Sequence, residues 1–142
     1  MASSLETDLN PNTYVGLSFP LRAGNNQDFA MTKNSLQQSR HNMKNLLLTY
    51  VGERVAQPEF GSRLREIIFE QIDDDLPSKI EEEVIRAVNT WLPYINIEEV
   101  NTLTDDGDKN KIFVEIKFST TLNPQTTESI TLDSSYTTTC LL

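Results

Sequence analysis

The feature that most constrains the fold of this chain is a stretch, residues 112–118, in which every second side chain is apolar. Side chains two residues apart in a β-strand lie on the same face, so the pattern predicts a strand with one buried face. That face consists of Ile112, Val114, Ile116 and Phe118, and Glu115 and Lys117 point the other way. A strand with one apolar face needs a second layer to cover it, and the rest of the sequence must supply that layer.

Two upstream segments have apolar residues at helical spacing and are predicted to belong to the covering layer. The first begins at Ser35 and continues to Val51, with Gly52 as its expected C-cap. The second spans residues 64–72, with Ser62 as its expected N-cap. The connection between them contains Pro58 and a second glycine, which indicates a tight and rigid loop.

A third helix is predicted from Ser78 to Trp91. Ser78 and Glu81 have the spacing of a capping box, which satisfies two backbone donors at a helix N-terminus. Trp91 lies on the apolar stripe of this helix, so packing in the core is its expected role. Pro93 ends the helix because proline has no amide hydrogen and restricts the residue before it.

Three more strands are expected beside the central one, at residues 15–21, 94–103 and 129–132. In the second of these the apolar residues change phase near Glu98 and Glu99, which predicts a β-bulge. The connecting loops are expected at residues 22–32, at residues 105–108 and at Asn123-Pro124. The last strand has polar residues at alternate positions and no helix after it, so an open sheet edge is expected there.

The order of elements predicts an α+β domain, in which a short N-terminal strand and three helices pack on a small antiparallel sheet formed by a C-terminal meander of three strands. Residues 14–133 form this single domain in our interpretation. Residues 1–13 are expected to form a flexible arm, and residues 134–142 a polar tail.

Composition excludes several classes of function. The chain has 21 acidic and 12 basic residues among 142, and its net charge of −9 would repel the phosphates of a nucleic acid. No apolar run approaches the roughly 18 residues of a membrane-spanning helix, and no signal peptide is evident, so we expect no membrane partner. Cys140 is the only cysteine, which excludes an internal disulfide and indicates a reducing cytoplasm.

The sequence offers few candidates for chemistry. Glu53, Glu59 and the carboxylates at residues 73–75 could supply the acid pair of a glycoside hydrolase, but nothing indicates a sugar cleft between them. Residues 105–108 resemble the start of a calcium loop without its closing ligand, so a turn is the preferred interpretation. His41 has no second ligand nearby and is expected at the surface. We therefore predict no catalytic residue, no cofactor and no metal.

Several short sequence motifs, in a specific order, resemble those of a known protein family. Leu47-Leu48-Thr49-Tyr50-Val51-Gly52-Glu53-Arg54 is followed by Gln57-Pro58-Glu59-Phe60-Gly61-Ser62, then by Leu64 and Phe69-Glu70. Gly16-Leu17-Ser18-Phe19-Pro20-Leu21 precedes them, and Phe113 to Phe118 with Asn123-Pro124 follows. From about Gly16 to Leu132, the chain resembles the baseplate wedge and sheath-initiator family of contractile phage tails, which has a counterpart in type VI secretion baseplates.

The resemblance implies a structural protein of the virion, assembled in the host cytoplasm and located in the tail baseplate. Such a subunit would link the wedge core proteins to the first ring of sheath and template sheath assembly by strand addition. The implied partners are other baseplate wedge proteins and the tail sheath protein. Contact with the tail tube protein or the tube-initiator protein is a further interpretation that stays open. Two alternatives remain open: a peptidoglycan-cleaving, lysozyme-like enzyme of the baseplate, and a type VI secretion baseplate subunit.

The resemblance also implies two sets of contact residues. Contact with the wedge core is expected at Arg54, Glu59, Phe60, Pro93 and Tyr94. Contact with the sheath is expected at Ile112, Phe113, Val114, Glu115, Ile116, Lys117, Phe118, Ile130 and Leu132. In one place the chain departs from the family pattern, because Leu92-Pro93-Tyr94 stands where the family has Glu-Pro-Arg.

Elementary geometry adds three expectations at these positions. Gly52 and Gly61 should adopt positive φ or allow close backbone approach, and Arg54 and Glu59 should lie close enough to pair. The ring of Tyr94 could either pack on the sheet or face a partner, and these two interpretations stay open. The same holds for Phe113, which points away from the apolar face of its strand.

Overall fold

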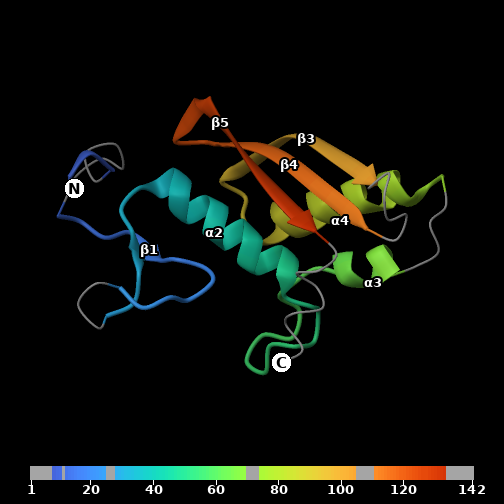
Figure 1. Cartoon of the computed structure of the whole chain (residues 1–142), viewed down its shortest axis with the longest axis horizontal. Coiled ribbons are helices and arrows are strands. Elements are labelled where there is room, and N and C mark those ends of the chain that lie inside the picture. The colour runs from blue at the N-terminus through green and yellow to red at the C-terminus, as the bar shows by residue number, and fades with distance from the viewer. Residues whose placement is uncertain (1–7, 11, 25–27, 70–73, 105–110, 134–142) are drawn as a thin grey trace.

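The computed structural model describes residues 8–10, 12–24, 28–69, 74–104 and 111–133. The elements follow in the order β1 (Gly16–Leu17), β2 (Met31–Thr32), α2 (Ser35–Leu48), α3 (Leu64–Phe69), α4 (Leu76–Trp91), β3 (Ile95–Thr104), β4 (Ile112–Thr120) and β5 (Asn123–Asp133). β1 and β2 form a small antiparallel pair, and β3, β4 and β5 form a three-stranded meander (Figure 1). The predicted α+β fold, with three helices and a C-terminal meander, is confirmed.

The meander has β4 at its centre and β3 and β5 at its two ends. The register between β3 and β4 shifts between Ile97 and Glu99, which confirms the predicted bulge. The expected turn at Asn123-Pro124 is wrong by about one position: Thr121 and Leu122 form the turn, and Asn123 already pairs with Thr120. A proline is compatible with this position because β5 is an end strand, where an amide hydrogen is not required on both sides.

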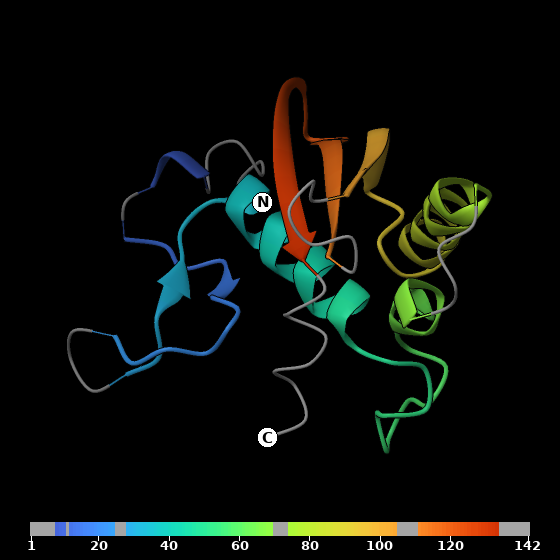
Figure 2. The same ribbon diagram turned by 45° about the vertical axis from the view of Figure 1, so that its right-hand side comes forward.

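One face of the meander is covered by α2 and α4, with α4 beside β3 and α2 beside β5 (Figure 2). The predicted apolar face of β4 is fully inside this interface, because its four side chains are at most 2% exposed. They pack with residues from the helices, including Met43, Leu46, Ile80, Val84 and Val88. Burial of these apolar surfaces is the main stabilising contribution to the fold.

The helix ends differ from the prediction in two places. α2 ends at Leu48 and not near Gly52, because Thr49 leaves the helical region while its N–H and its hydroxyl both donate to the carbonyl of Asn45. α4 begins at Leu76, two residues before the predicted cap, so Ser78 lies inside the first turn and the capping box is wrong. Leu76 is buried, and its place in the core extends the helix backward through Pro77, which the first turn tolerates.

The N-terminal segment forms a small hairpin instead of a single strand and a loop. Only Gly16 and Leu17 of the predicted strand are paired, and Met31 and Thr32 from the expected loop are their partners. Ser18 still donates to the carbonyl of Ala30, but the chain then turns away at Pro20, which has no N–H to continue the ladder. The hairpin stands at one end of the molecule, away from α3 and α4 (Figures 1 and 2).

Candidate assembly surfaces

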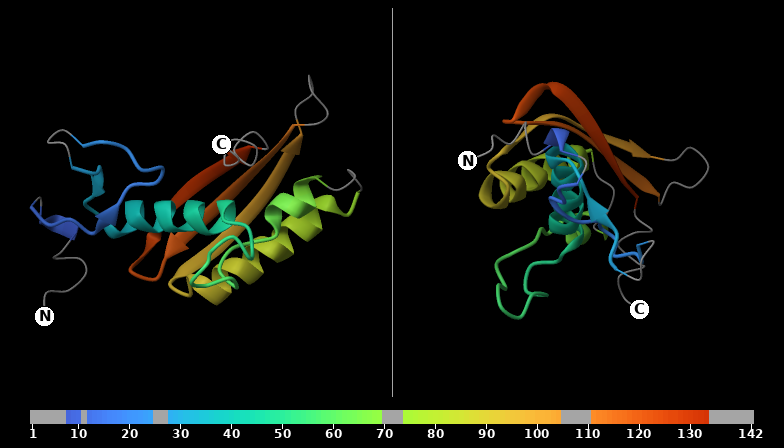
Figure 3. Two further views of the ribbon diagram at one scale, coloured as in Figure 1. Left: turned by 90° about the horizontal axis from the view of Figure 1, so that it is seen from below. Right: turned by 90° about the vertical axis from the view of Figure 1, so that its left-hand side faces the viewer.

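The connection between α2 and α3, residues 49–63 (the α2–α3 loop), projects from the helices on the side opposite to the meander (Figure 3). Both of its glycines have positive φ, 95° at Gly52 and 127° at Gly61, as predicted. At Gly61 a Cβ atom would also lie 2.5 Å from the carbonyl oxygen of Thr49, so only glycine allows the two backbone segments to meet. Hydrogen bonds from Ser62 N–H to Thr49 and from Gly52 N–H to Pro58 close the loop on itself.

A stack of three side chains fixes the position of this loop on α4. The guanidinium carbon of Arg54 lies 4.3 Å from the centre of the Phe60 ring, and Phe60 meets Trp91 edge to face with 5.2 Å between ring centres. Both contacts are favourable, one through the cation and the ring quadrupole and the other through offset aromatic packing. The predicted pairing of Arg54 with Glu59 is wrong, because the Phe60 ring holds the guanidinium group instead.

Pro93 and Tyr94 follow Leu92, the C-cap of α4, so they lie at the end of α4 on which the Phe60 ring packs. Pro93 is exposed, whereas Tyr94 is half-buried against the core. The Tyr94 hydroxyl accepts a hydrogen bond from the Asn42 amide of α2 at 2.9 Å, and its carbonyl accepts from the N–H and hydroxyl of Thr121. Tyr94 therefore packs on α2 and on the β4–β5 turn, and the exposed face at this point is Pro93.

Glu83 of α4 is a structurally important carboxylate that the sequence analysis did not single out. It is buried, accepts a hydrogen bond from the N–H of Arg63 just before α3, and receives two more from the Arg86 guanidinium group. The hydrogen bonds from Arg86 lower the pKa of Glu83, against the opposing effect of burial, and the pKa of Arg86 is raised in return. The signal in the sequence was its position three residues after Ile80, beside the apolar stripe of α4.

An open hollow of about 540 Å³ lies between the α2–α3 loop and α4, and Glu59, Glu83 and Arg86 are among its lining residues. The general acid of a glycoside hydrolase needs a carboxyl group whose pKa is raised by burial. The pKa of Glu83 is lowered instead, because its carboxylate is bonded to Arg86 and to a backbone N–H. The hollow therefore does not offer Glu83 as a proton donor.

The other predicted carboxylates do not gather into a site. Glu53 is exposed and accepts a hydrogen bond from the N–H of Tyr50, so it closes a turn. Asp74 and Asp75 are exposed at the start of α4, while Asp73, the predicted calcium-like turn at residues 105–108 and Cys140 lie outside the described residues. Among the residues that the structure describes, no cluster of three or more His, Cys, Asp or Glu side chains is placed to hold a metal ion.

The residues predicted to contact the sheath divide into two groups. The side chains of Ile112, Val114, Ile116, Phe118, Ile130 and Leu132 are buried in the core. β4 is paired with β3 and β5, so it offers no free edge for an added strand, whereas the last strand, where the open edge was expected, does lie at the end of the meander. The apolar alternation of residues 112–118 reflects the covering of one face of the sheet by α2 and α4. Among the described strands, the unpaired edges belong to β3 and β5.

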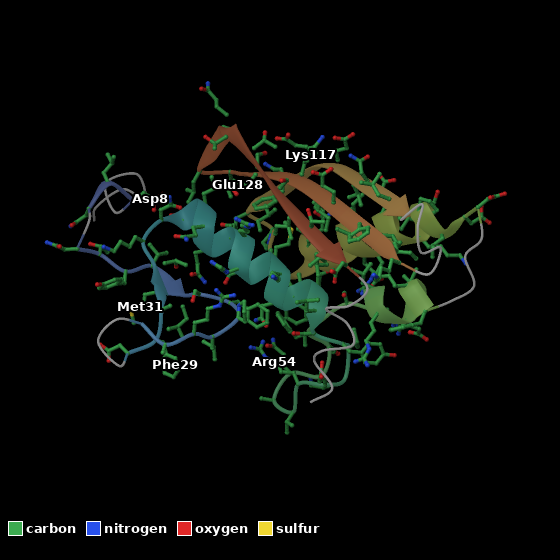
Figure 4. The ribbon with its side chains drawn as sticks, in the orientation of Figure 1. Asp8, Phe29, Met31, Arg54, Lys117 and Glu128 are labelled. Atoms are coloured by element: carbon green, nitrogen blue, oxygen red, sulfur yellow. The ribbon has the colours of Figure 1, made fainter. Side chains whose placement is uncertain are left out.

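Phe113, Glu115 and Lys117 are half-exposed on the face of the meander that no helix covers. There the Lys117 ammonium group lies 2.6 Å from the Glu99 carboxylate of β3, and this hydrogen-bonded pair lowers the pKa of Glu99 and raises that of Lys117. Thr127 of β5 donates to the carboxylate of Glu98 in the bulge of β3. The uncovered face is therefore mainly polar, and Figure 4 shows Lys117 on the sheet.

His41 is not the isolated surface residue that the sequence suggested. Its Nδ1 atom lies 2.8 Å from the carbonyl oxygen and 3.1 Å from the amide nitrogen of Phe19, so it connects α2 to the N-terminal hairpin. This contact joins residues that are 22 positions apart in the chain, and no local pattern indicates it. Among the described helices, none combines the length and the apolar character needed to cross a lipid bilayer.

Comparisons with known proteins agree with these features. The family described as baseplate wedge protein gp25 matches residues 34–125, from the N-cap of α2 to the start of β5. The baseplate wedge protein gp25 of Enterobacteria phage T4 is 31% identical over 97 residues, which are 68% of this chain and 73% of that protein.

Two solved structures share the fold. In the cryo-EM structure of the anti-feeding prophage baseplate, one chain aligns with a TM-score of 0.66 and 20% identity, over 73% of this chain and 82% of its own length. A crystal structure from Geobacter sulfurreducens, described provisionally as a tail lysozyme, aligns with a TM-score of 0.62 and 24% identity, over 73% and 94% of the two chains. The family match and the phage relative establish that this chain belongs to the gp25 family of baseplate wedge proteins, structural components of contractile tails.

Proposed function

We propose that this chain links the wedge proteins of the baseplate to the first ring of tail sheath, and that it starts sheath assembly by accepting a strand along β5. The observation that carries the proposal is the place of β5 at the end of the meander, where it pairs only with β4 in the described part of the chain. An end strand has a row of backbone N–H and C=O groups along one edge, and an extended segment of another protein can bond to them.

The side chains of β5 suit this role. Ile130 and Leu132 are buried on the side of the helices, whereas Ser129 and Thr131 are exposed on the other side. A strand added to β5 would place apolar side chains beside the first pair and polar side chains beside the second, and this alternation would set its register. Pro124 has no N–H to offer, so the pairing region would be residues 126–133.

The wedge proteins would contact the opposite side of the molecule, at the α2–α3 loop and Pro93. Arg54 and Glu59 are exposed on this loop, and Val55 is fully exposed at 101%. The loop is held by its own backbone hydrogen bonds and by the Phe60–Trp91 contact, so little conformational entropy would be lost when a partner binds. Tyr94 would support this surface from inside, and the tail tube has no assigned surface in the proposal.

The proposal includes no catalytic activity. The lowered pKa of Glu83 is the supporting observation, because a carboxylate held ionised by Arg86 is a poor general acid. The purified protein is therefore expected to release no soluble fragments from peptidoglycan under conditions where hen egg-white lysozyme does. Release of fragments that is lost in Glu83→Gln would contradict this part of the proposal.

The strand-addition step can be tested with two proline variants at neighbouring positions, Glu128→Pro and Ser129→Pro. Adjacent residues of an antiparallel strand direct their N–H groups to opposite sides. One of the two prolines therefore removes a hydrogen bond to β4, and the other removes only an N–H group on the outer edge of β5. Thermal unfolding identifies the variant that keeps the midpoint of the wild type. Tails assembled with that variant should show baseplates and bare tubes without sheath in electron micrographs.

The matched control is Gln125→Pro, which lies beside the natural proline and before the proposed pairing region. Tails assembled with this control should carry normal sheath. Normal contractile tails from the well-folded variant at residue 128 or 129 would contradict strand addition along β5 and would direct attention to the edge of β3.

A further inference from the structure

The N-terminal hairpin, residues 14–24 and 28–33 of the described chain, exposes an unusual amount of apolar surface. Its exposed large apolar side chains are Tyr14, Val15, Leu17, Leu21, Phe29 and Met31. Phe29 and Met31 point outward from the hairpin in Figure 4. Exposed apolar side chains that occur singly are normal at protein surfaces, but a contiguous group marks a surface that another molecule covers.

The hairpin is also hollowed. An open depression of about 620 Å³ is lined by Tyr14 before β1, by Ala23 and Phe29 from the connection between the strands, by Met31 of β2 and by Lys33 just after β2. The Nζ atom of Lys33 lies 5.6 Å from the centre of the Tyr14 ring, so a positive charge stands at one border of the depression. Asp28 also lines it. The surface therefore has an apolar floor and charged borders, the usual arrangement of a protein-binding site.

Polar contacts hold the hairpin in a fixed orientation on α2. His41 bonds to the backbone of Phe19, and the Thr32 hydroxyl bonds to the Gln38 side chain. Asp8 accepts from both the N–H and the hydroxyl of Ser35 at the start of α2. These bonds position the hairpin without covering its apolar side chains. A surface that is positioned in advance loses little entropy on binding.

Charge distinguishes this end of the molecule from the rest. Residues 1–48 contain four basic and three acidic side chains and carry a net charge of +1, whereas residues 49–142 contain eight basic and eighteen acidic side chains and carry −10. The basic residues of the first part are Arg22, Lys33, Arg40 and Lys44, and they belong to the hairpin and to α2. An acidic partner would be repelled by most of this protein but not by the hairpin end.

We infer that the N-terminal hairpin docks onto a partner protein in the tail, at an apolar patch bordered by Asp and Glu side chains. The apolar floor would supply affinity, and Arg22, Lys33 and Arg40 would complement the acidic border. This interface lies outside the β5 edge and outside the α2–α3 loop, so it does not depend on strand addition. The hairpin itself lies before residue 34, where the match to the gp25 family begins.

The first test is photo-crosslinking in assembled tails from cells whose only copy of the full chain carries p-benzoylphenylalanine at position 29. The matched control places the same group at position 69, because Phe29 is 60% exposed and Phe69 is 62% exposed on α3. Position 29 should crosslink to an apolar peptide flanked by acidic residues in another tail protein, and position 69 should not give this adduct. A crosslink from position 29 only to a second copy of this protein, or only to the C-terminal residues of the same chain, would overturn the inference.

The second test compares serine variants by the amount of this protein that purified tails contain. Phe29→Ser and Leu21→Ser should each reduce its incorporation at least about tenfold with unchanged circular dichroism, whereas Phe69→Ser should not. Arg22→Glu should slow incorporation more than Lys111→Glu, which changes the net charge equally at a distant exposed site. Normal incorporation of both Phe29→Ser and Leu21→Ser would overturn the inference.

Membrane binding is the remaining competing outcome. Cosedimentation of the wild-type chain with vesicles of 30% phosphatidylserine, lost in Phe29→Ser, would assign the apolar surface to lipid and overturn the inference. Because loss of sheath from intact baseplates reports on β5, whereas loss of this protein from the tail reports on the hairpin, the two proposals can fail separately.

Discussion

Phe118 in β4 is fully buried, whereas Phe29, which lies just before β2 in the N-terminal hairpin, is 60% exposed. The helix–sheet body, which we define as residues 35–133 of the described chain, places its apolar residues between α2, α4 and the meander. Among the described residues no second layer covers the hairpin, and His41 and Gln38 of α2 hold it through hydrogen bonds to Phe19 and Thr32. Apolar side chains are therefore buried only where another element is available to cover them.

The largest expected effect contrasts these two phenylalanines directly. Phe118→Ala should lower the free energy of unfolding by about 4 kcal/mol, because it removes buried surface and leaves a cavity. Phe29→Ala should lower it by less than about 0.5 kcal/mol. Urea denaturation followed by circular dichroism measures both values. Equal losses in the two variants would show that the hairpin belongs to the core.

The α2–α3 loop is also expected to be part of the cooperatively folded body, and substitutions at its two glycines test this through the free energy of unfolding. Gly61→Ala should lower the free energy of unfolding by about 3 kcal/mol. The added methyl group would clash with the Thr49 carbonyl oxygen, and alanine is also strained at the positive φ of this position. Gly52→Ala should lower the free energy of unfolding by only about 1 kcal/mol. No atom lies within 4 Å of the Cβ position at Gly52, so only the backbone strain of the positive φ remains. The reverse order in thermal unfolding would contradict the close approach at Gly61.

Glu83→Gln tests the polar contact inside the body. It should cost about 2 kcal/mol at pH 7, because the ionised carboxylate bonds Arg86 and the Arg63 N–H in a buried site. The pKa of Glu83 is lowered in the folded state, so its stabilisation is present above the ordinary carboxyl pKa and is lost as pH falls through the lowered value. The stability of the glutamine variant should therefore approach that of the wild type below about pH 4. A difference that stays constant from pH 7 to pH 3 would contradict the ionic contact.

His41→Ala should loosen the hairpin without unfolding the body. Amide hydrogen exchange is the suitable measurement, because it separates local opening from global unfolding. The amides of Ser18 and Ala30, which bond within the hairpin, should exchange about tenfold faster, and those of Val114 and Ile116 should not change. Equal acceleration in both groups would place His41 in the cooperative core.

The smallest effect is expected on the uncovered face of the meander. Lys117→Gln removes the pair with Glu99, but both groups are exposed to solvent, and such pairs contribute little to stability. The thermal midpoint should change by no more than the experimental error. A clear loss of sheath in tails that carry this variant would indicate that the face itself, and not only the β5 edge, contacts a partner.

Local sequence patterns predicted most of the body. The alternation from Ile112 to Phe118, the proline after Trp91 and the two loop glycines each correspond to a feature of the structure. The predicted ends of α2 and α4 were wrong, because the Thr49 hydroxyl bonds to the carbonyl of Asn45 one turn earlier and because Leu76 is buried in the core. Helix ends are decided by such small differences, so local propensity rarely determines them alone.

The candidate contact surfaces were less predictable. Arg54 pairs with a ring and not with Glu59, and Glu83 is buried among three consecutive glutamates that look alike in sequence. The choice among Glu81, Glu82 and Glu83 depends on which face of α4 meets the start of α3, and this is a property of the packing.

By itself the sequence determined the fold class, the bulge in β3, the loop between the two glycines and the membership of the gp25 family, because each depends on residues that are near one another in the chain. The tertiary structure alone decided which carboxylate is buried and which apolar residues remain exposed. These features depend on the order of strands and on the element that covers each face. Contacts such as His41 with Phe19 form only when the chain folds, so the surfaces proposed for partners follow from the packing and not from any single segment.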